Sequence, residues 1–156
     1  MNFKLIRKAN LLLSGLIISL GISTLPASAQ QVSETQVSAL VEALRKAAPP
    51  NSKNDGMYSQ WQILPGNIPR WSKFCLKQEL TPQQFEADTA KARLVITCIV
   101  RDTLREEYKA SGNNELVAVR RSACWWMTGK STACTSGDTA TYVQKVLSFY
   151  QQERTK

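Results

Sequence analysis

The chain has 156 residues, a formal net charge of +8 and no histidine. The absence of histidine excludes Ser-His-Asp triads, Cys-His dyads, acid–base catalysis by imidazole and histidine-ligated metals. Net positive charge favours anionic neighbours, but an ordinary solvated surface explains it equally well. The chain has no long Lys/Arg run, so we expect no nucleic-acid partner.

The first 29 residues have the pattern of a cleavable secretory signal peptide. Three basic residues precede the apolar run 11–20, and Ala27 and Ala29 form a small-x-small cleavage site after Pro26. The run is shorter than the about 20 apolar residues that a stable membrane span requires. We therefore expect cleavage after Ala29, no transmembrane anchor after cleavage, and a mature single α-helical domain at 30–156, which is 127 of the 156 residues with a charge of +5.

Four cysteines, Cys75, Cys98, Cys124 and Cys134, lie in the mature chain. In the oxidising compartment that an export signal implies, an even number of cysteines favours disulfides. Cys124 and Cys134 flank a Gly/Ser/Thr loop that can fold back, so we pair them, which leaves Cys75 with Cys98. A zinc site is disfavoured because C-x-x-C spacing and histidine are both absent, and no metal or cofactor is expected.

The first mature segment is predicted to be a helix over 33–48. Ser33 and Gln36 have the spacing of a capping box, and Pro49 ends the helix. Its apolar residues recur at helical spacing. They are Val37, Leu40, Val41 and Leu44.

Two short helices are predicted after an extended, turned stretch at 61–66. Pro69 is suited to the first turn of a helix, which would bury Trp71, Phe74 and Cys75 on one face. A second capping box begins at Thr81.

The segment 88–111 contains the apolar run 92–100, in which Arg93 is the only charge. Its apolar residues lie all round a helical wheel, so a helix here would be largely buried. Residues 94–100 are also rich in β-branched side chains, which suits a strand. We favour the helix because the chain offers few other strands to pair with, and Gly112 follows as a left-handed cap.

Two further helices are predicted in the last third. Asn114 caps the helix 115–128, and Gly129 closes it. After a loop, Asp138 is expected to cap a final helix that runs to about residue 152. The predicted fold is therefore all-α, a small bundle of four main helices plus short helical pieces, stapled by two disulfides.

The pair Trp125-Trp126 is the most distinctive local feature. On a helical wheel Trp126 falls on the apolar side with Leu116, whereas Trp125 falls opposite, one turn from Arg121. That spacing permits a cation–π contact, and an exposed tryptophan beside an arginine suits a sugar ring or an anionic polymer. Trp125 and Arg121 are thus the candidate ligand-binding residues, with the alternative that Trp125 packs against another helix or covers the 124–134 bridge.

Paired carboxylates could serve a glycosidase, and Glu106 and Glu107 are adjacent near the end of the central helix. Adjacent residues on a helix point about 100° apart, which suits a shared active site poorly. Arg105 and Lys109 surround them, so we interpret the group as a solvated charged face. No other catalytic signature is present, and no catalytic residue is assigned.

Three stretches, at 68–73, 113–121 and 125–129, resemble a group of small exported cyanobacterial proteins of unknown function. The shared residues read Ile-Pro-Arg-Trp-Ser-Lys, then Asn-Asn-Glu through Ala-Val-Arg-Arg, then Trp-Trp-Met-Thr-Gly. The resemblance covers most of the mature chain and implies export. It implies no activity and no functional residue, because the group has no established activity.

The sequence favours a non-enzymatic exported binding or structural protein of unknown activity. Its partner would be an anionic wall polymer or another exported protein. A Sec-type signal serves the periplasm, the thylakoid lumen and the extracellular medium alike. The alternative is a cell-wall polysaccharide-acting enzyme or sugar-binding protein built around Trp125 and nearby charged residues.

Overall fold

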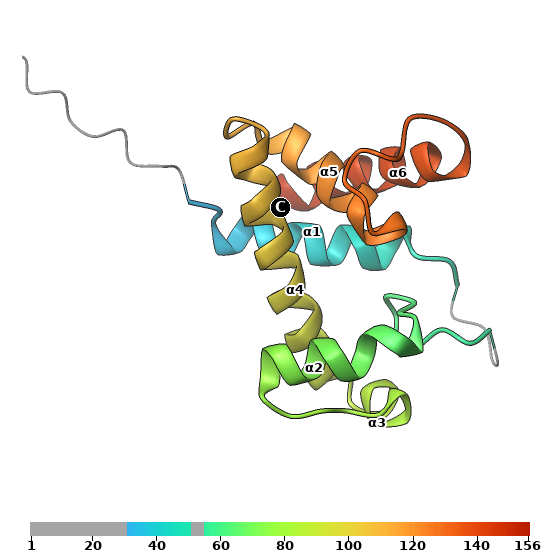
Figure 1. The fold of residues 1–156 in the computed structure, drawn as a ribbon. Helices are drawn as coiled ribbons and strands as arrows, with labels where there is room; N and C mark the ends of the chain where they lie inside the picture. Colours follow the sequence, from blue (N-terminus) through green and yellow to red (C-terminus); the bar gives the residue numbers. More distant parts are fainter. Residues whose placement is uncertain (1–30, 51–54) are drawn as a thin grey trace, which may run out of the picture.

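The computed structural model describes residues 31–50 and 55–156 (Figure 1). Within these residues the chain forms six α-helices, one 3-10 turn and no strand beyond an isolated bridge. The predicted all-α, disulfide-stapled fold is therefore confirmed. The predicted signal peptide, residues 1–29, lies outside the described residues.

The first helix, α1 (Glu34–Ala47), starts and ends as its sequence predicts. Its capping box is present, because Ser33 Oγ accepts the amide of Gln36 at 3.2 Å and Gln36 Oε1 accepts the amide of Ser33 at 2.8 Å. One face of α1 is almost completely buried, and α1 packs chiefly on α6 (Gly137–Arg154) and on α4 (Thr89–Ala110).

A compact turn connects α1 to the second helix. Tyr58 and Ile63 pair through two backbone hydrogen bonds, at 3.0 and 2.8 Å. The turn buries Trp61, whose indole Nε1 donates to the carbonyl of Val41 at 2.9 Å. This bond satisfies the one polar atom of a buried indole and fixes the turn against α1. The 3-10 turn Pro65–Asn67 follows.

The helix α2 (Ile68–Leu76) forms where Pro69 predicts it, but its buried face is not the predicted one. Ile68 and Ser72, one turn apart, are the buried residues, and Trp71 and Cys75 are half-buried. The prediction for Phe74 was wrong, because its side chain is 54% exposed. At about 100° per residue, Phe74 lies on the side opposite Ser72.

The long helix α4 contacts α1, α2 and the helices directly before and after it in the chain. It rules out the strand alternative for 94–100, and Asp88 caps it by accepting the amide of Lys91 at 2.9 Å. The short helix α3 (Pro82–Ala87) precedes it, with the predicted Thr81 capping box and a fully buried Phe85. Figure 1 shows α2 and α3 packed on the first half of α4. We call these three segments the lower tier.

The upper tier contains α1, α6, α5 (Glu115–Thr128) and the second half of α4. Asn114 and Gly129 cap α5 as predicted. The prediction that Asp138 caps the last helix was wrong. That helix begins at Gly137, and Asp138 lies in its first turn, where a carboxylate favours the helix dipole.

Both predicted disulfides are confirmed. Cys75–Cys98 links α2 to α4, and Cys124–Cys134 links the end of α5 to the loop that precedes α6. Disulfides are rare in reducing compartments, so this pair of bridges indicates a non-cytoplasmic location.

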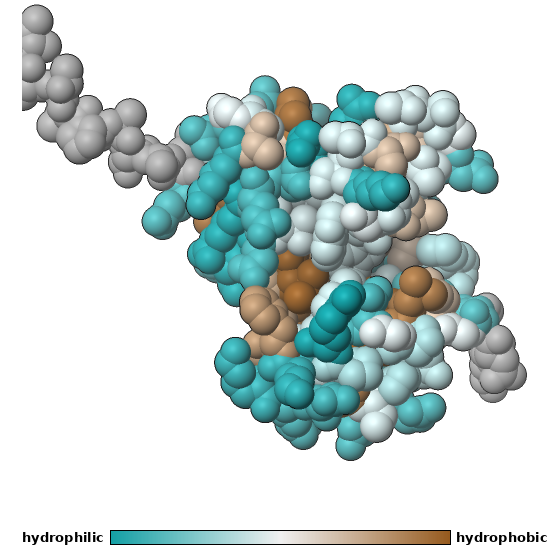
Figure 2. Space-filling model, in the orientation of Figure 1, coloured by the Kyte–Doolittle hydropathy of each residue, from teal (hydrophilic) through white to brown (hydrophobic). Residues whose placement is uncertain are grey.

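One hydrophobic cluster joins residues of both tiers. Figure 2 shows apolar side chains, in brown, in the hollow between the two tiers. Across the part of the chain that is described, none of the helices has the length and apolar character of a membrane span.

Candidate ligand-binding cleft

Three tryptophan rings meet where the two tiers face each other. Trp71 of α2 stacks on Trp125 with ring centroids 6.3 Å apart, and it packs against Trp126 at 5.6 Å. Trp125 and Trp126 are both half-buried, and Leu116, expected on the buried side with Trp126, is exposed. The predicted division into a core Trp126 and an outward Trp125 was therefore wrong. Trp125 packs against another helix, which is the alternative stated for it.

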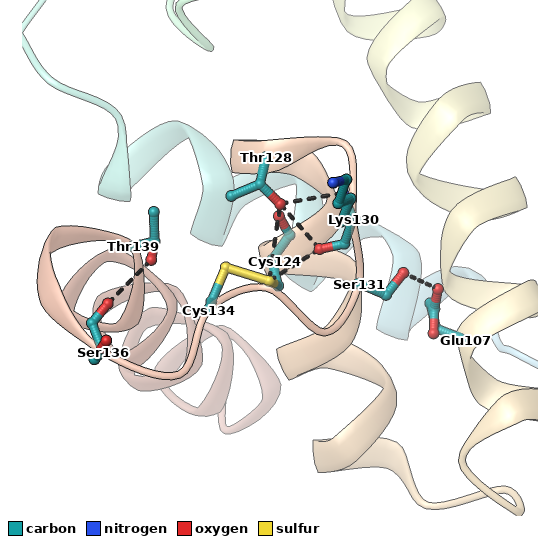
Figure 3. Close-up of a disulfide and its surroundings, with 8 residues drawn as sticks. All are labelled: Glu107, Cys124, Thr128, Lys130, Ser131, Cys134, Ser136 and Thr139. Atoms are coloured by element: carbon teal, nitrogen blue, oxygen red, sulfur yellow. Dashed lines mark hydrogen bonds between the residues drawn. A yellow bond between two sulfur atoms is a disulfide. The ribbon is translucent and has the colours of Figure 1, made fainter.

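Arg121, the second predicted ligand-binding residue, is held by a carboxylate rather than by a ring. Its Nε donates to Glu107 Oε2 at 2.5 Å. Glu107 also accepts a hydrogen bond from the Ser131 hydroxyl, as Figure 3 shows. The structure therefore does not bring Arg121 and Trp125 together as a cation–π pair.

Glu107 itself was placed wrongly on a solvated face. Its side chain is buried, with 8% of the residue exposed, whereas its neighbour Glu106 is exposed. A buried carboxylate needs a counter-charge and hydrogen-bond donors, and Arg121 and Ser131 supply both. The pair Glu106–Glu107 is thus divided between solvent and core, which removes it as a catalytic dyad.

A cleft of about 650 Å³ opens beside the tryptophan cluster. The end of α1, the 57–67 turn, the end of α5 and the first half of α6 form its walls. Most of its lining is apolar, with aromatic rings, two thioethers and aliphatic carbons. The apolar residues are Ala47, Ala48, Pro49, Pro50, Met57, Trp61, Leu64, Trp126, Met127 and Tyr142.

A few polar groups are set into this lining. Burial raises the pKa of the Tyr142 hydroxyl well above its usual value, so this group stays neutral at physiological pH. Lys145 Nζ lies 3.4 Å from the carbonyl of Ala47, and Asp55 accepts the amide of Met57 at 2.9 Å. These groups fix the walls and leave an apolar interior with a polar rim.

The size and apolar lining of the cleft are suited to binding an organic molecule. Among residues 31–50 and 55–156, no three Cys, Asp or Glu side chains gather in a way that could hold a metal ion.

No family model, curated protein or solved structure matches this chain. Sequence reasoning did not find the cleft, because its walls come from four segments whose meeting depends on how the helices pack. Met57, Leu64 and Met127 carry no local pattern that marks them as neighbours.

Proposed function

We propose that this protein is a non-enzymatic binding domain that holds one small, largely apolar molecule in the cleft formed by α1, the 57–67 turn, α5 and α6. It would act after export by a Sec-type signal peptide, in the periplasm, the thylakoid lumen or the extracellular medium. The observation that carries the proposal is the cleft itself, with its volume of about 650 Å³ and its aromatic and thioether lining.

The size and chemistry of the cleft favour a small molecule. Binding sites for organic ligands occupy about 300–1,000 Å³ and combine an apolar lining with a few polar groups. Leu64 and Met127, two apolar residues of the lining, are 57% and 50% exposed. Covering such surface is favourable by about 25 cal/mol per Å² of apolar area. Met57 and Met127 can adapt to an irregular apolar shape because methionine is flexible and polarisable.

The polysaccharide alternative has less support from the geometry. A sugar ring stacks on an open aromatic face, but Trp71 lies against the ring of Trp125. The carboxylate nearest to Arg121, that of Glu107, is buried and already paired. Trp125 does not line the cleft, so we place the ligand against Trp126 and Tyr142.

The test uses N-phenyl-1-naphthylamine, a neutral probe that fluoresces in apolar sites. The exported protein without its signal peptide is titrated with the probe. We expect saturable one-to-one binding. Ala48→Phe places a ring in the cleft, because Ala48 is half-buried in its wall, and should abolish the binding. The matched control is Ala90→Phe, since Ala90 is exposed at the start of α4.

A thermal melt of each variant accompanies the titration, because loosely folded proteins also bind apolar dyes. The proposal holds if the three proteins melt alike and only Ala48→Phe loses the probe. It fails if the well-folded protein shows no saturable binding, or if Ala48→Phe binds as the unmodified protein does.

A further inference from the structure

A second, smaller cavity lies beside the Cys124–Cys134 bridge. It has a volume of about 250 Å³, and Arg120 and Arg121 of α5 form one side of it. The loop 130–136 also lines it, through Ser131, Thr132 and Thr135. Figure 3 shows this loop folded back onto α5 by the disulfide.

The charge of this cavity is positive. Arg121 is balanced by the buried Glu107 through one N–H group, and a guanidinium has four further N–H donors. Arg120 is exposed and takes part in no ion pair within the described part of the chain. The cavity thus holds one uncompensated positive charge next to two exposed threonine hydroxyls.

The loop 130–136 is anchored at Lys130, Ser131 and Cys134. The Cys124–Cys134 bridge anchors it to α5, and the hydroxyl of Ser131 donates to Glu107. Thr128 Oγ1 accepts the amide of Lys130 at 3.1 Å and donates to its carbonyl oxygen at 2.9 Å, as Figure 3 shows. These contacts hold the loop that carries Thr132 and Thr135 in the wall of the cavity before any ligand arrives, which lowers the entropy cost of binding.

From this geometry we propose that the cavity binds one tetrahedral oxyanion, a phosphate or sulfate group, between Arg120 and the loop hydroxyls. Arginine donates paired N–H groups to such oxygens, and these charge-assisted bonds are stronger than neutral ones. The volume lies below the range of drug-sized ligands, which fits a single oxyanion group. This site is independent of the apolar cleft and does not rest on it.

The oxyanion could be a free ion or a group on a larger molecule, so the experiment has an arm for each. Amide chemical shifts of the exported protein are followed during titration with inorganic phosphate and inorganic sulfate, with ionic strength held constant by sodium chloride. A second series uses dextran sulfate as the polymer-borne group. We expect saturable shifts at Thr132 and Thr135.

Arg120→Ala should raise the dissociation constant by about tenfold, which corresponds to the loss of one charge-assisted hydrogen bond. Thr132→Val, which keeps the shape of the side chain, should raise the dissociation constant severalfold. The matched control is Arg105→Ala, which removes the same charge from an exposed site on α4 and should leave the constant within a factor of two.

The outcomes are distinguishable. Saturation by the free ions that depends on Arg120 supports a soluble oxyanion, and saturation by dextran sulfate alone with the same dependence supports a polymer-borne one. The proposal is overturned if neither series saturates, or if Arg105→Ala weakens binding as much as Arg120→Ala does. The latter result would mean that only net charge attracts the anion.

Discussion

The carboxylate of Glu115 joins three helices of the upper tier, and its replacement by glutamine has a calculable effect. Glu115 lies in the first turn of α5. Its Oε1 accepts the hydroxyl of Tyr150 at 2.6 Å and Nε of Arg154 at 3.0 Å, both from α6. Its Oε2 accepts Nε2 of Gln36, on α1, at 2.8 Å.

These contacts also set the ionisation of Glu115. Burial alone would raise the pKa of this carboxyl, but hydrogen bonds from Tyr150 and Gln36 and the charge of Arg154 outweigh it and hold the pKa below the usual 4.5. A carboxyl whose pKa is lower in the folded state contributes stability above its unfolded pKa. That contribution is lost as the pH falls below about 4.5 and through the folded pKa.

Glu115→Gln keeps the shape of the side chain, removes the charge and points an amide N–H₂ toward donors. Hydrogen bonds to charged groups contribute about 1.5–3 kcal/mol each when buried. The Glu115 side chain is 32% exposed, so solvent screening reduces this figure. We expect a loss of about 1–3 kcal/mol at pH 7, which corresponds to a fall in Tm of about 3–12 °C for a domain of this size.

The assay is thermal or urea denaturation of the unmodified protein and Glu115→Gln at pH 7 and at pH 3. Other carboxylates titrate equally in both proteins, so the difference between them isolates Glu115. That difference should shrink toward zero at pH 3. Glu106→Gln, at an exposed site on α4, is the control and should change little at either pH. An equal difference at pH 7 and pH 3 would refute this reasoning.

Three further predictions concern stability. Phe85→Ala should cost about 3–5 kcal/mol in urea denaturation because Phe85 is fully buried, whereas Phe74→Ala should cost less than about 1 kcal/mol; equal costs would contradict the packing of the lower tier. Replacing both Cys75 and Cys98 by alanine opens a loop of 23 residues and should lower the free energy of unfolding by about 3 kcal/mol. Mass mapping of the unmodified, non-reduced protein should recover two peptides linked by the Cys75–Cys98 bridge. Trp61→Phe leaves a buried carbonyl of α1 without its indole donor and should lower the free energy of unfolding by about 1–3 kcal/mol. A loss of less than about 0.5 kcal/mol, the size expected for surface substitutions, would show that this bond does not fix the turn.

The local elements of the fold could be predicted because their signals are local. The Ser33 and Thr81 capping boxes, the Asn114 cap and the Gly129 stop all lie within a few residues of the helix ends that they determine. The disulfide pairing followed from loop length, because Cys124 and Cys134 flank a segment that can fold back.

The wrong predictions for Phe74 and Glu107 share a different cause. Periodicity gives the relative directions of side chains on one helix, but it does not say which direction meets another helix. Phe74 faces solvent because Ser72, not Phe74, contacts the chain at Leu80, whose amide it accepts at 2.8 Å. Glu107 is buried because a disulfide loop 24 residues later covers it with Ser131.

The cleft could not be predicted for the same reason, since no local pattern brings Met57, Trp126 and Tyr142 together. The candidate residues Trp125 and Arg121 were chosen from one helical wheel. Their partners, Trp71 and Glu107, lie on other helices. Whether either residue contributes to ligand binding stays a prediction.

The central claim is that the cleft holds a small apolar molecule, and the two methionines that follow the predicted signal peptide report on it directly. Met57 and Met127 are the only methionines besides Met1, and both line the cleft. The measurement is a methyl spectrum of ¹³C-methionine-labelled exported protein during titration with N-phenyl-1-naphthylamine. Both methyl resonances should shift together to saturation in the unmodified protein and stay in place in Ala48→Phe. Two unmoved resonances while the probe fluoresces would place the ligand elsewhere and contradict the account.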